Sequence, residues 1–418
     1  MSGYLRRLRC VRCGRQYPDP SLALIGAGCP ACAGAGVPAN VLPVYDLTAG
    51  ELPVDPSQPG LFRYRALLPL AAGTAAVSLG EGGTPVVGLP RLADRAGVAE
   101  VWVKDESRNP TWSYKDRLAA VAVTKAVEAG TETVVVASTG NHGAAVAAYA
   151  ARAGLRCVVL TLASVPPTMK TLMQSYGADV VALQRPADRW TLMRELVAAR
   201  GWMAMSGHAD PPAGSHPYGV DGYKTIAYEL AGQLPRPPDV VVVPVAYGDG
   251  LAGIGRGFAD LAALGLIDRV PRLIAAEPFG PLAAALAAGS DTAGPVPVRP
   301  SVAFSTASPF GTQQSLATLR ASDGAAIATP DDEEIMATQL QLAREAGLYL
   351  EAASVTAAVA LCKARPAGLV AADDRVVIIG SSTGLKDVGA TAARLPEVPM
   401  IEPSVGALDE ALAARPAR

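Results

Sequence analysis

Lys115 stands where a turn meets an apolar run, in the stretch NPTWSYKDRLAAVAVTKA that covers residues 109–126. Charged amines are normally excluded from apolar surroundings, so a lysine at this point requires a chemical explanation. A desolvated lysine has a lowered pKa, and its neutral amine can attack an aldehyde to form a Schiff base. The sequence therefore predicts that Lys115 is a nucleophilic amine rather than a surface charge.

Two further loops have the composition of anion-binding sites. ASTGNHGAA (137–145) and PVAYGDGLAGIGRGF (244–258) each follow a strand-like run and open a helix-like run. Free backbone N–H groups and the helix dipole at such a point favour a carboxylate or a phosphate. Each loop alone is more often an ordinary connection, and the second matches neither the dinucleotide fingerprint nor the Walker pattern. Together with Lys115, however, they are the parts needed to hold pyridoxal phosphate and an amino acid.

Four of the six cysteines form two C-x-x-C pairs, Cys10 with Cys13 and Cys29 with Cys32. Two such knuckles aim four thiolates at one point, which predicts a zinc ribbon with a structural Zn²⁺. The alternative is that the metal has been lost and the thiols are free. Cys157 and Cys362 lie in apolar runs and are expected to be core thiols.

Composition restricts the class of function. Hydrophobic residues make up 50% of the 418 residues, charged residues make up 18%, and the formal net charge is −2. The chain has no basic block, which argues against a nucleic-acid surface and an electrostatic membrane anchor. We find neither a secretory signal nor an apolar run of membrane-spanning length, so we expect a cytoplasmic enzyme acting on small molecules.

The elements that must position these loops alternate between strands and helices. Short β-branched runs without polar alternation are typical of parallel strands buried on both faces, so we expect an α/β fold with two parallel sheets. Ligands in such folds bind at the carboxyl ends of the strands. Residues 33–60 are rich in proline and glycine and are expected to be a linker and an extended arm. The expected strands are 133–138, 157–162, 179–184, 202–207, 239–245, 272–278 and 375–381.

With these loops, the sequence resembles the fold-type II pyridoxal-phosphate enzymes, which are the tryptophan synthase β family. Within that family it resembles the threonine synthases. NPTWSYKDR is similar to the family's N-P-T-x-S-F-K-D-R, STGNHG to its S-x-G-N loop, and PVAYGDGLAGIGRGF to its phosphate loop. GSSTGLKD (380–387) is similar to T-G-H-G-L-K-D, and GEGGTP (80–85) to G-E-G-x-T-P. The five motifs occur in the family's order, and an N-terminal zinc ribbon also occurs in threonine synthase relatives.

The resemblance implies the role of each site residue. Lys115 falls on the Schiff-base lysine, and Asn141 on the asparagine that bonds the cofactor's ring hydroxyl. Ser381 falls on the hydroxyl that faces the pyridine nitrogen, which favours prompt elimination over a long-lived carbanion. The substrate carboxylate is expected at Ser138, Thr139 and His142, and the cofactor phosphate on the backbone of Ala246, Tyr247, Gly248, Asp249 and Gly250.

Several positions depart from the threonine synthase pattern. Gly219 stands where the family often carries an arginine, whose forked donor suits a substrate phosphate. Residues 301–311 likewise lack the family's arginine, and Thr383 replaces a histidine. Asp249 would repel a phosphate unless its carboxylate turns away to cap the helix. These departures concern the substrate rather than the cofactor.

The resemblance also implies a domain organisation. We expect a zinc ribbon at 1–38, a large cofactor-binding domain formed by 39–117 and 208–400, a small mobile domain at 118–207, and a tail at 401–418. Family habit predicts a homodimer.

The expected function is that of a pyridoxal-phosphate dependent lyase. It would eliminate or replace a substituent of a small amino acid, as in the conversion of O-phosphohomoserine or a related activated amino acid to a threonine-like product. One alternative is a serine or threonine dehydratase acting as an ammonia-lyase, which the stretch GNHG favours. Another is a non-catalytic homologue that keeps the cofactor.

Overall fold

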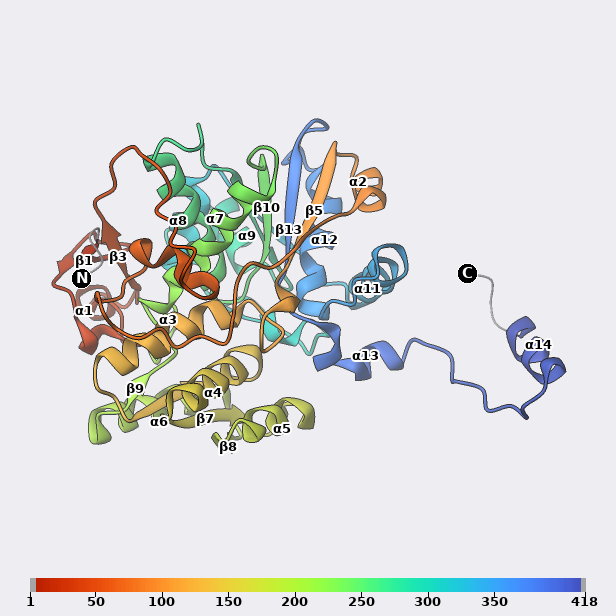
Figure 1. Cartoon of the computed structure of the whole chain (residues 1–418), viewed down its shortest axis with the longest axis horizontal. Coiled ribbons are helices and arrows are strands. Elements are labelled where there is room, and N and C mark those ends of the chain that lie inside the picture. Colours follow the sequence, from red (N-terminus) through yellow and green to blue (C-terminus); the bar gives the residue numbers. More distant parts are fainter. Residues whose placement is uncertain (1–4, 415–418) are drawn as a thin grey trace.

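A computed structural model describes residues 5–414, and its elements alternate between strands and helices (Figure 1). Residues 1–4 of the expected zinc ribbon and residues 415–418 of the expected tail lie outside this described part. Three sheets organise the chain: one of six strands, one of four and one of three. The α/β class predicted from the sequence is confirmed.

The six-stranded sheet has the order β12-β11-β10-β13-β5-β4. All neighbouring strands are parallel except β4, which runs antiparallel to β5. Every residue of the central strand β10 is buried, as its continuous valine run predicts. The strands are β4 (Val86–Gly88), β5 (Glu100–Asp105), β10 (Val240–Pro244), β11 (Arg272–Glu277), β12 (Ala325–Ala328) and β13 (Arg375–Gly380).

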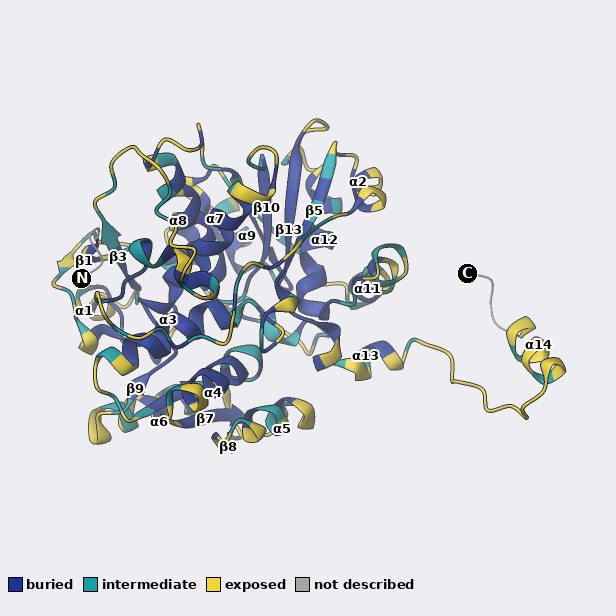
Figure 2. Cartoon of the chain, viewed as in Figure 1, coloured by how far each residue is buried: buried dark blue, intermediate teal, exposed yellow. Residues whose placement is uncertain are grey.

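Successive side chains of a strand point to opposite sides, so each strand presents side chains to both faces of this sheet. Helices cover both faces. Val241 and Val243 pack into the core shared with α7, α8 and α10, whereas Val240 and Val242 pack into the core shared with α2, α11 and α12. The β10 and β13 strands are accordingly buried along their length (Figure 2). The helices are α2 (Pro90–Ala96), α7 (Lys224–Gln233), α8 (Asp249–Ala263), α9 (Pro281–Ala287), α10 (Gln313–Ala321), α11 (Asp332–Ala346) and α12 (Ala352–Ala364).

The four-stranded sheet has the order β8-β7-β6-β9 and is parallel throughout. One face packs on α6 through Val135, Leu160 and Met193, and the other joins the core that includes α3 and α4. The elements are β6 (Thr133–Ala137), β7 (Arg156–Leu162), β8 (Asp179–Leu183), β9 (Met203–Ala204), α3 (Lys115–Glu128), α4 (Asn141–Ala153), α5 (Pro167–Ser175) and α6 (Pro186–Arg200).

The N-terminal sheet is antiparallel, with β1 (Leu5–Cys10) between β2 (Gln16–Tyr17) and β3 (Val41–Tyr45). Helix α1 (Pro30–Gly34) follows β2. The expectation that 33–60 is only a linker is wrong, because β3 pairs with β1 in the register Cys10 to Val41. The apolar pattern VLPVY hides this strand, since a proline normally argues against a ladder position.

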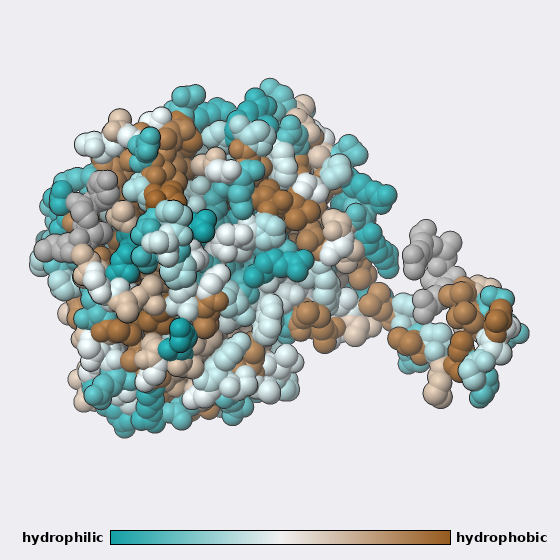
Figure 3. All heavy atoms as spheres, viewed as in Figure 1, coloured by the Kyte–Doolittle hydropathy of each residue, from teal (hydrophilic) through white to brown (hydrophobic). Residues whose placement is uncertain are grey.

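The last part of the chain leaves the body. Helix α13 (Val388–Ala392) borders the six-stranded lobe, and a connecting segment carries α14 (Val405–Ala413) away from it (Figure 1). Val405, Leu408 and Leu412 are exposed on α14, where brown spheres lie among teal and pale ones in the space-filling view (Figure 3). Short 3₁₀ segments occupy Leu22–Leu24, Gly60–Leu67, Glu106–Arg108, Gly219–Tyr223, Phe304–Thr306 and Gly384–Lys386.

The seven strands expected from the sequence are all present, although β9 is far shorter than the expected 202–207. The β4, β5 and β12 strands were not predicted. Among the described residues, no helix is both long and apolar enough to cross a membrane.

A buried ionic cluster fixes the start of α3. The guanidinium of Arg117 donates to Glu106 Oε2 at 2.7 Å and to Glu229 Oε1 at 2.6 Å. Lys104 Nζ donates to the other oxygen of Glu229, Oε2, at 2.6 Å. All four side chains are almost completely inaccessible to solvent, and the two positive and two negative charges cancel. The cluster therefore joins β5, α3 and α7 at one point.

We expect Arg117→Met to lower the free energy of unfolding by about 3–5 kcal/mol, because it leaves Glu106 and Glu229 buried without their main partner. Urea denaturation would measure this loss. The matched control is Arg156→Met, which breaks the exposed pair with Asp179 and should lower stability by at most about 1 kcal/mol. Equal losses in the two variants would contradict the structural role of the cluster.

Candidate active site

The segment that precedes Lys115 is tied to the loop that follows β13. Ser113 and Ser382 form an antiparallel bridge, and the amide of Tyr114 donates to the carbonyl of Ser381 at 2.9 Å. Lys115 is then the first residue of α3. Two sequence motifs that are 266 residues apart, at 115 and 381, are therefore neighbours at the carboxyl edge of the six-stranded sheet.

The side chain of Lys115 is partly buried between aromatic rings. Its Nζ lies 5.2 Å from the ring centroid of Tyr114 and 5.7 Å from that of Tyr223. Burial lowers the pKa of Lys115, and the carboxylate of Asp249 partly opposes this effect. A larger fraction of the amine is thus neutral and nucleophilic than for a lysine in water.

The loop between β6 and α4 holds the second group of predicted residues. The hydroxyl oxygen of Ser138 accepts from the amides of Gly140 at 3.2 Å and Gly143 at 2.8 Å, which shapes the start of the helix. Thr139 is partly buried beside it. His142 follows in the first turn, and its Nε2 atom is buried without a hydrogen-bond partner among the described residues.

The loop between β10 and α8 is held by packing that only glycine permits. Gly248 has a φ of +73°, and a Cβ atom there would lie 1.7 Å from Ser315 Oγ. A Cβ atom on Gly250 would lie 2.7 Å from Cε2 of the Tyr114 ring. The glycine loop therefore lies directly against the residue that precedes Lys115.

The backbone of this loop fits a phosphate. Within the described part of the chain, the amides of residues 246–250 donate no hydrogen bond. The carbonyl of Tyr247 is occupied instead, because it accepts from Thr312 Oγ1 at 2.7 Å and from Ser315 Oγ at 3.3 Å. The loop thus turns its carbonyl toward α10 and leaves its donors at the positive end of α8 for an anion.

Asp249 does turn away, but it does not cap α8. The residue at the cap position is Gly248, and no side chain bonds the helix start there. The buried carboxylate of Asp249 accepts instead from the Ser215 amide at 2.8 Å and from Gln314 Nε2 at 2.7 Å. Burial raises the pKa of Asp249, and Lys115 opposes this shift. The expected capping role was wrong because Ser215, far away in sequence, supplies a better donor.

Asn141 and Ser381 make their contacts with the start of α12 and with the loop after β13. Ser381 is buried, and its hydroxyl lies 2.8 Å from that of Ser354. Asn141 bonds two charged residues, Glu351 through Nδ2 at 2.8 Å and Lys386 through Oδ1 at 2.6 Å. None of these three partners was predicted. Lys386 lies within the GSSTGLKD motif, but Glu351 and Ser354 open an apolar helix and carry no motif.

Four polar atoms near the site are buried without partners among the described residues: Ser113 Oγ, His142 Nε2, His216 Nε2 and the hydroxyl of Tyr223. The Tyr223 ring centroid lies 5.7 Å from Lys115 Nζ, and the Lys115 charge adds to the effect of burial on His142. Burial lowers the pKa of His142 well below its usual value and that of His216 to about 3, so both rings are neutral at pH 7. Buried polar groups are rarely left unpaired, which indicates a ligand at this place.

Position 219 has no room for the arginine that the family often carries. A Cβ atom on Gly219 would lie 3.1 Å from both Ala122 Cβ and Leu118 Cγ of α3. The amide of Gly219 donates instead to His216 Nδ1 at 3.1 Å. Position 219 therefore supplies no cation to the site.

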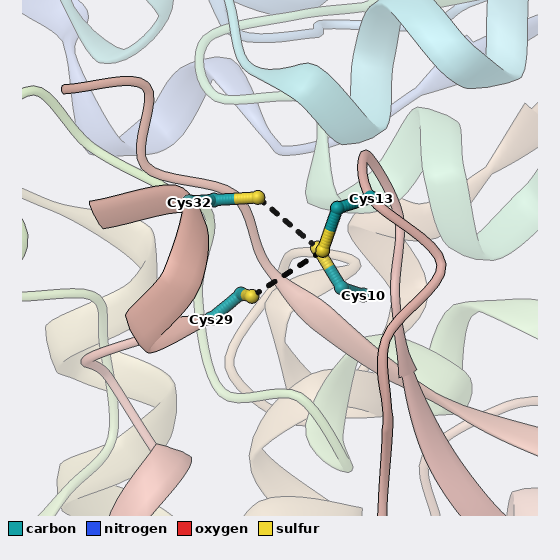
Figure 4. A group of neighbouring side chains, drawn as sticks. All are labelled: Cys10, Cys13, Cys29 and Cys32. Atoms are coloured by element: carbon teal, nitrogen blue, oxygen red, sulfur yellow. Dashed lines mark hydrogen bonds between the residues drawn. The ribbon is translucent and has the colours of Figure 1, made fainter. Parts of the chain in front are cut away.

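The four paired cysteines form a second cluster, in the N-terminal part of the chain (Figure 4). The ligand atoms of Cys10, Cys13, Cys29 and Cys32 all lie within 4.8 Å of one another. Cys10 and Cys13 come from the turn after β1, and Cys29 and Cys32 from the start of α1. Two short loops thus present four thiols to one point, as the spacing predicts.

Comparison with known proteins agrees with this geometry. A family model described as pyridoxal-phosphate dependent enzyme matches residues 77–382. A threonine synthase of Methanosarcina acetivorans is 32% identical and covers 97% of this chain and 98% of its own length. A threonine synthase of Mycobacterium leprae is 33% identical and covers 80% of this chain and 90% of its own.

Solved structures at lower identity share the fold. The processed form of threonine deaminase isoform 2 from Solanum lycopersicum superimposes with a TM-score of 0.62 at 22% identity, over 84% of this chain and 94% of that one. An O-ureido-L-serine synthase gives a TM-score of 0.61 at 23% identity, over 82% of this chain and 98% of that one.

Proposed function

The chain belongs to the family of pyridoxal-phosphate dependent enzymes, and we propose that it catalyses a threonine synthase-like elimination and replacement on a small amino acid. The observation that carries this function is the convergence of Lys115, the free amides of 246–250 and the loop of Ser381 on one site. Threonine synthases align over most of the chain, so the ammonia-lyase and non-catalytic alternatives are not favoured.

The residues present fit the cofactor, and their proposed roles follow from their positions. Bound pyridoxal phosphate supplies an electron sink for charge at the substrate's α-carbon. The amine of Lys115 would hold its aldehyde carbon, and the amides of residues 246–250 its phosphate. Asn141 would bond the ring oxygen, and the hydroxyl of Ser381 would face the ring nitrogen.

The same site would bind and deprotonate the substrate. Thr139 and His142, at the start of α4, would hold the substrate carboxylate with Ser138, whose oxygen already shapes the loop. The Lys115 amine would also serve as the base that takes the substrate's α-proton, and its pKa, lowered by burial, suits that transfer. We further propose that the unit built on β6–β9 is the mobile domain that closes over the substrate.

We propose O-phosphohomoserine, or a related activated amino acid, as the substrate. Arg189, in the first turn of α6, supports this choice because it is only 7% exposed and has no carboxylate within 4.0 Å among the described residues. Burial lowers the pKa of Arg189, and Tyr247 of the glycine loop opposes the shift. Arg189 Nε donates to the carbonyl of Pro186 at 3.2 Å, but its charge has no carboxylate partner among the described residues. An unpaired buried cation is unfavourable unless an anion binds it.

We also propose that Cys10, Cys13, Cys29 and Cys32 bind a structural Zn²⁺. Four cysteine sulfurs at tetrahedral reach match the ligand preference of zinc and leave no open coordination position. The metal would stabilise the N-terminal sheet rather than take part in the reaction. We also propose that the protein is a cytoplasmic homodimer, as expected from its composition and from the family to which it belongs.

Purified holoenzyme should release phosphate from O-phosphohomoserine and form threonine in equal amounts, because the phosphate leaves the γ-carbon and water adds to the β-carbon. A coupled phosphate assay beside threonine quantification measures both products. Formation of a 2-oxo acid from serine or threonine at a higher kcat/KM would contradict the synthase function and favour a dehydratase.

In the same assay Arg189→Gln should raise KM for O-phosphohomoserine about tenfold or more, as expected for the loss of a buried charge contact. Arg185→Gln is the matched control, because Arg185 lies four residues earlier, is exposed and already pairs with Asp188. Equal KM values in the two variants would remove Arg189 from the substrate site.

Elemental analysis of the purified protein should find one zinc per chain, and Cys29→Ser should lose it and unfold at lower temperature. Cys157 lies in the buried strand β7, away from the cluster, so Cys157→Ser should keep the metal. A wild-type protein that stays metal-free after exposure to Zn²⁺ would rule out the structural site.

A further inference from the structure

Asn141 is held between two opposite charges that nothing in the expected mechanism uses. Lys386 Nζ donates to its Oδ1 atom at 2.6 Å, and its Nδ2 atom donates to Glu351 Oε2 at 2.8 Å. Ser382 Oγ lies 3.3 Å from Oδ1, but its one proton has a nearer acceptor in the Trp112 carbonyl, at 3.1 Å. Lys386, Ser382 and Glu351 come from the β13 loop and from the start of α12, two elements at the carboxyl edge of the large sheet. We call Lys386 and Glu351 the charge clamp on Asn141.

Both charged partners are buried. Lys386 is 5% exposed and Glu351 is 2% exposed. No carboxylate lies within 4.0 Å of Lys386 Nζ in the part of the chain that the structure describes, so Asn141 is its one hydrogen-bond acceptor there. Burial lowers the pKa of Lys386 to about 8, while Glu351 and Asp116 oppose the shift. The ammonium is thus mostly protonated at pH 7.

The two charges permit only one orientation of the amide. In the observed orientation the carbonyl oxygen faces an ammonium and the amide nitrogen faces a carboxylate. A flipped amide would point N–H donors at a group that can only donate, and its oxygen at a group that accepts. Since both contacts are buried, the flip would leave two charged groups without partners, which is strongly unfavourable.

The fixed orientation has a consequence for the cofactor. One N–H of Asn141 is used by Glu351 and the other has no acceptor among the described residues, whereas Oδ1 accepts from Lys386. An asparagine held this way can only donate to a ring oxygen, and a donor stabilises that oxygen in its ionised form. Lys386 adds a positive charge one amide away.

We propose that Lys386 and Glu351 are positioning residues, which lock Asn141 as a hydrogen-bond donor to the cofactor's ring oxygen and so keep that oxygen ionised. This inference rests on the proposed function, because it concerns the same cofactor site. It assigns a task to a second buried lysine of the site, distinct from that of Lys115.

The test is the visible spectrum of the holoenzyme at pH 7. Ionised and protonated ring oxygens give a long-wavelength and a near-ultraviolet band, respectively, and their ratio reports the equilibrium. We expect Lys386→Met to lower this ratio about tenfold, because it removes a charge and frees the amide. Glu351→Gln should lower it less, since a glutamine can still accept from Nδ2, and Lys386→Arg should restore most of the wild-type ratio.

A double-mutant cycle shows whether Lys386 acts through Asn141. In an Asn141→Ala background, Lys386→Met should change the ratio little further. Lys363→Met is the matched control, because Lys363 lies on α12 but is partly exposed and pairs with Glu334. Thermal unfolding of each variant checks the fold, and Glu351→Gln carries the test if Lys386→Met does not fold.

A wild-type ratio in folded Lys386→Met, or a full additional effect of Lys386→Met in Asn141→Ala, would overturn the inference while leaving the proposed function intact. A wild-type protein that develops no visible cofactor band after addition of pyridoxal phosphate would overturn both. The two failures are therefore distinguishable.

Discussion

The site depends on the burial of Arg117 between Glu106 and Glu229. Its guanidinium makes bonds of 2.6–2.8 Å to both carboxylates and cannot move without exposing them to an apolar interior. Because Arg117 belongs to the first turn of α3, this cluster also fixes the direction in which Lys115 leaves the helix. The two carboxylates fully compensate the charge of Arg117, whereas the charge of Lys115 has no such partner. Arg117 thus holds the neighbouring reactive lysine in place.

Around this fixed point, three helix starts supply the polar groups. Lys115 opens α3, Asn141 opens α4 and Asp249 opens α8. The first turns of helices hold free amides, so their convergence provides donors without adding cations. Asp249, the one carboxylate among these first residues, is drawn off by the Ser215 amide and Gln314. The site consequently stays receptive to an anion although an acid lies in the glycine loop.

Much of this arrangement could be predicted from the sequence. Continuous valine runs such as 240–243 indicated buried parallel strands, and the carboxyl-edge rule then placed their loops together. The charge clamp on Asn141 could not be predicted in the same way, because Glu351 begins an alanine-rich helix and carries no local pattern. Nor could the pairing of β3 with β1, since its proline argued for an extended arm. Contacts between residues far apart in the sequence determine these two features, and the local composition does not indicate them.

We propose that Lys115, and not Lys386, the other buried lysine of the site, bonds the cofactor. Both amines have pKa values lowered by burial, so chemistry alone does not separate them. Borohydride reduction of the holoenzyme, followed by proteolysis and mass spectrometry, locates the bond directly. We expect one pyridoxyl group per chain, on Lys115. A label on Lys386, or no label at all, would contradict the assignment of Lys115 as the lysine that bonds the cofactor.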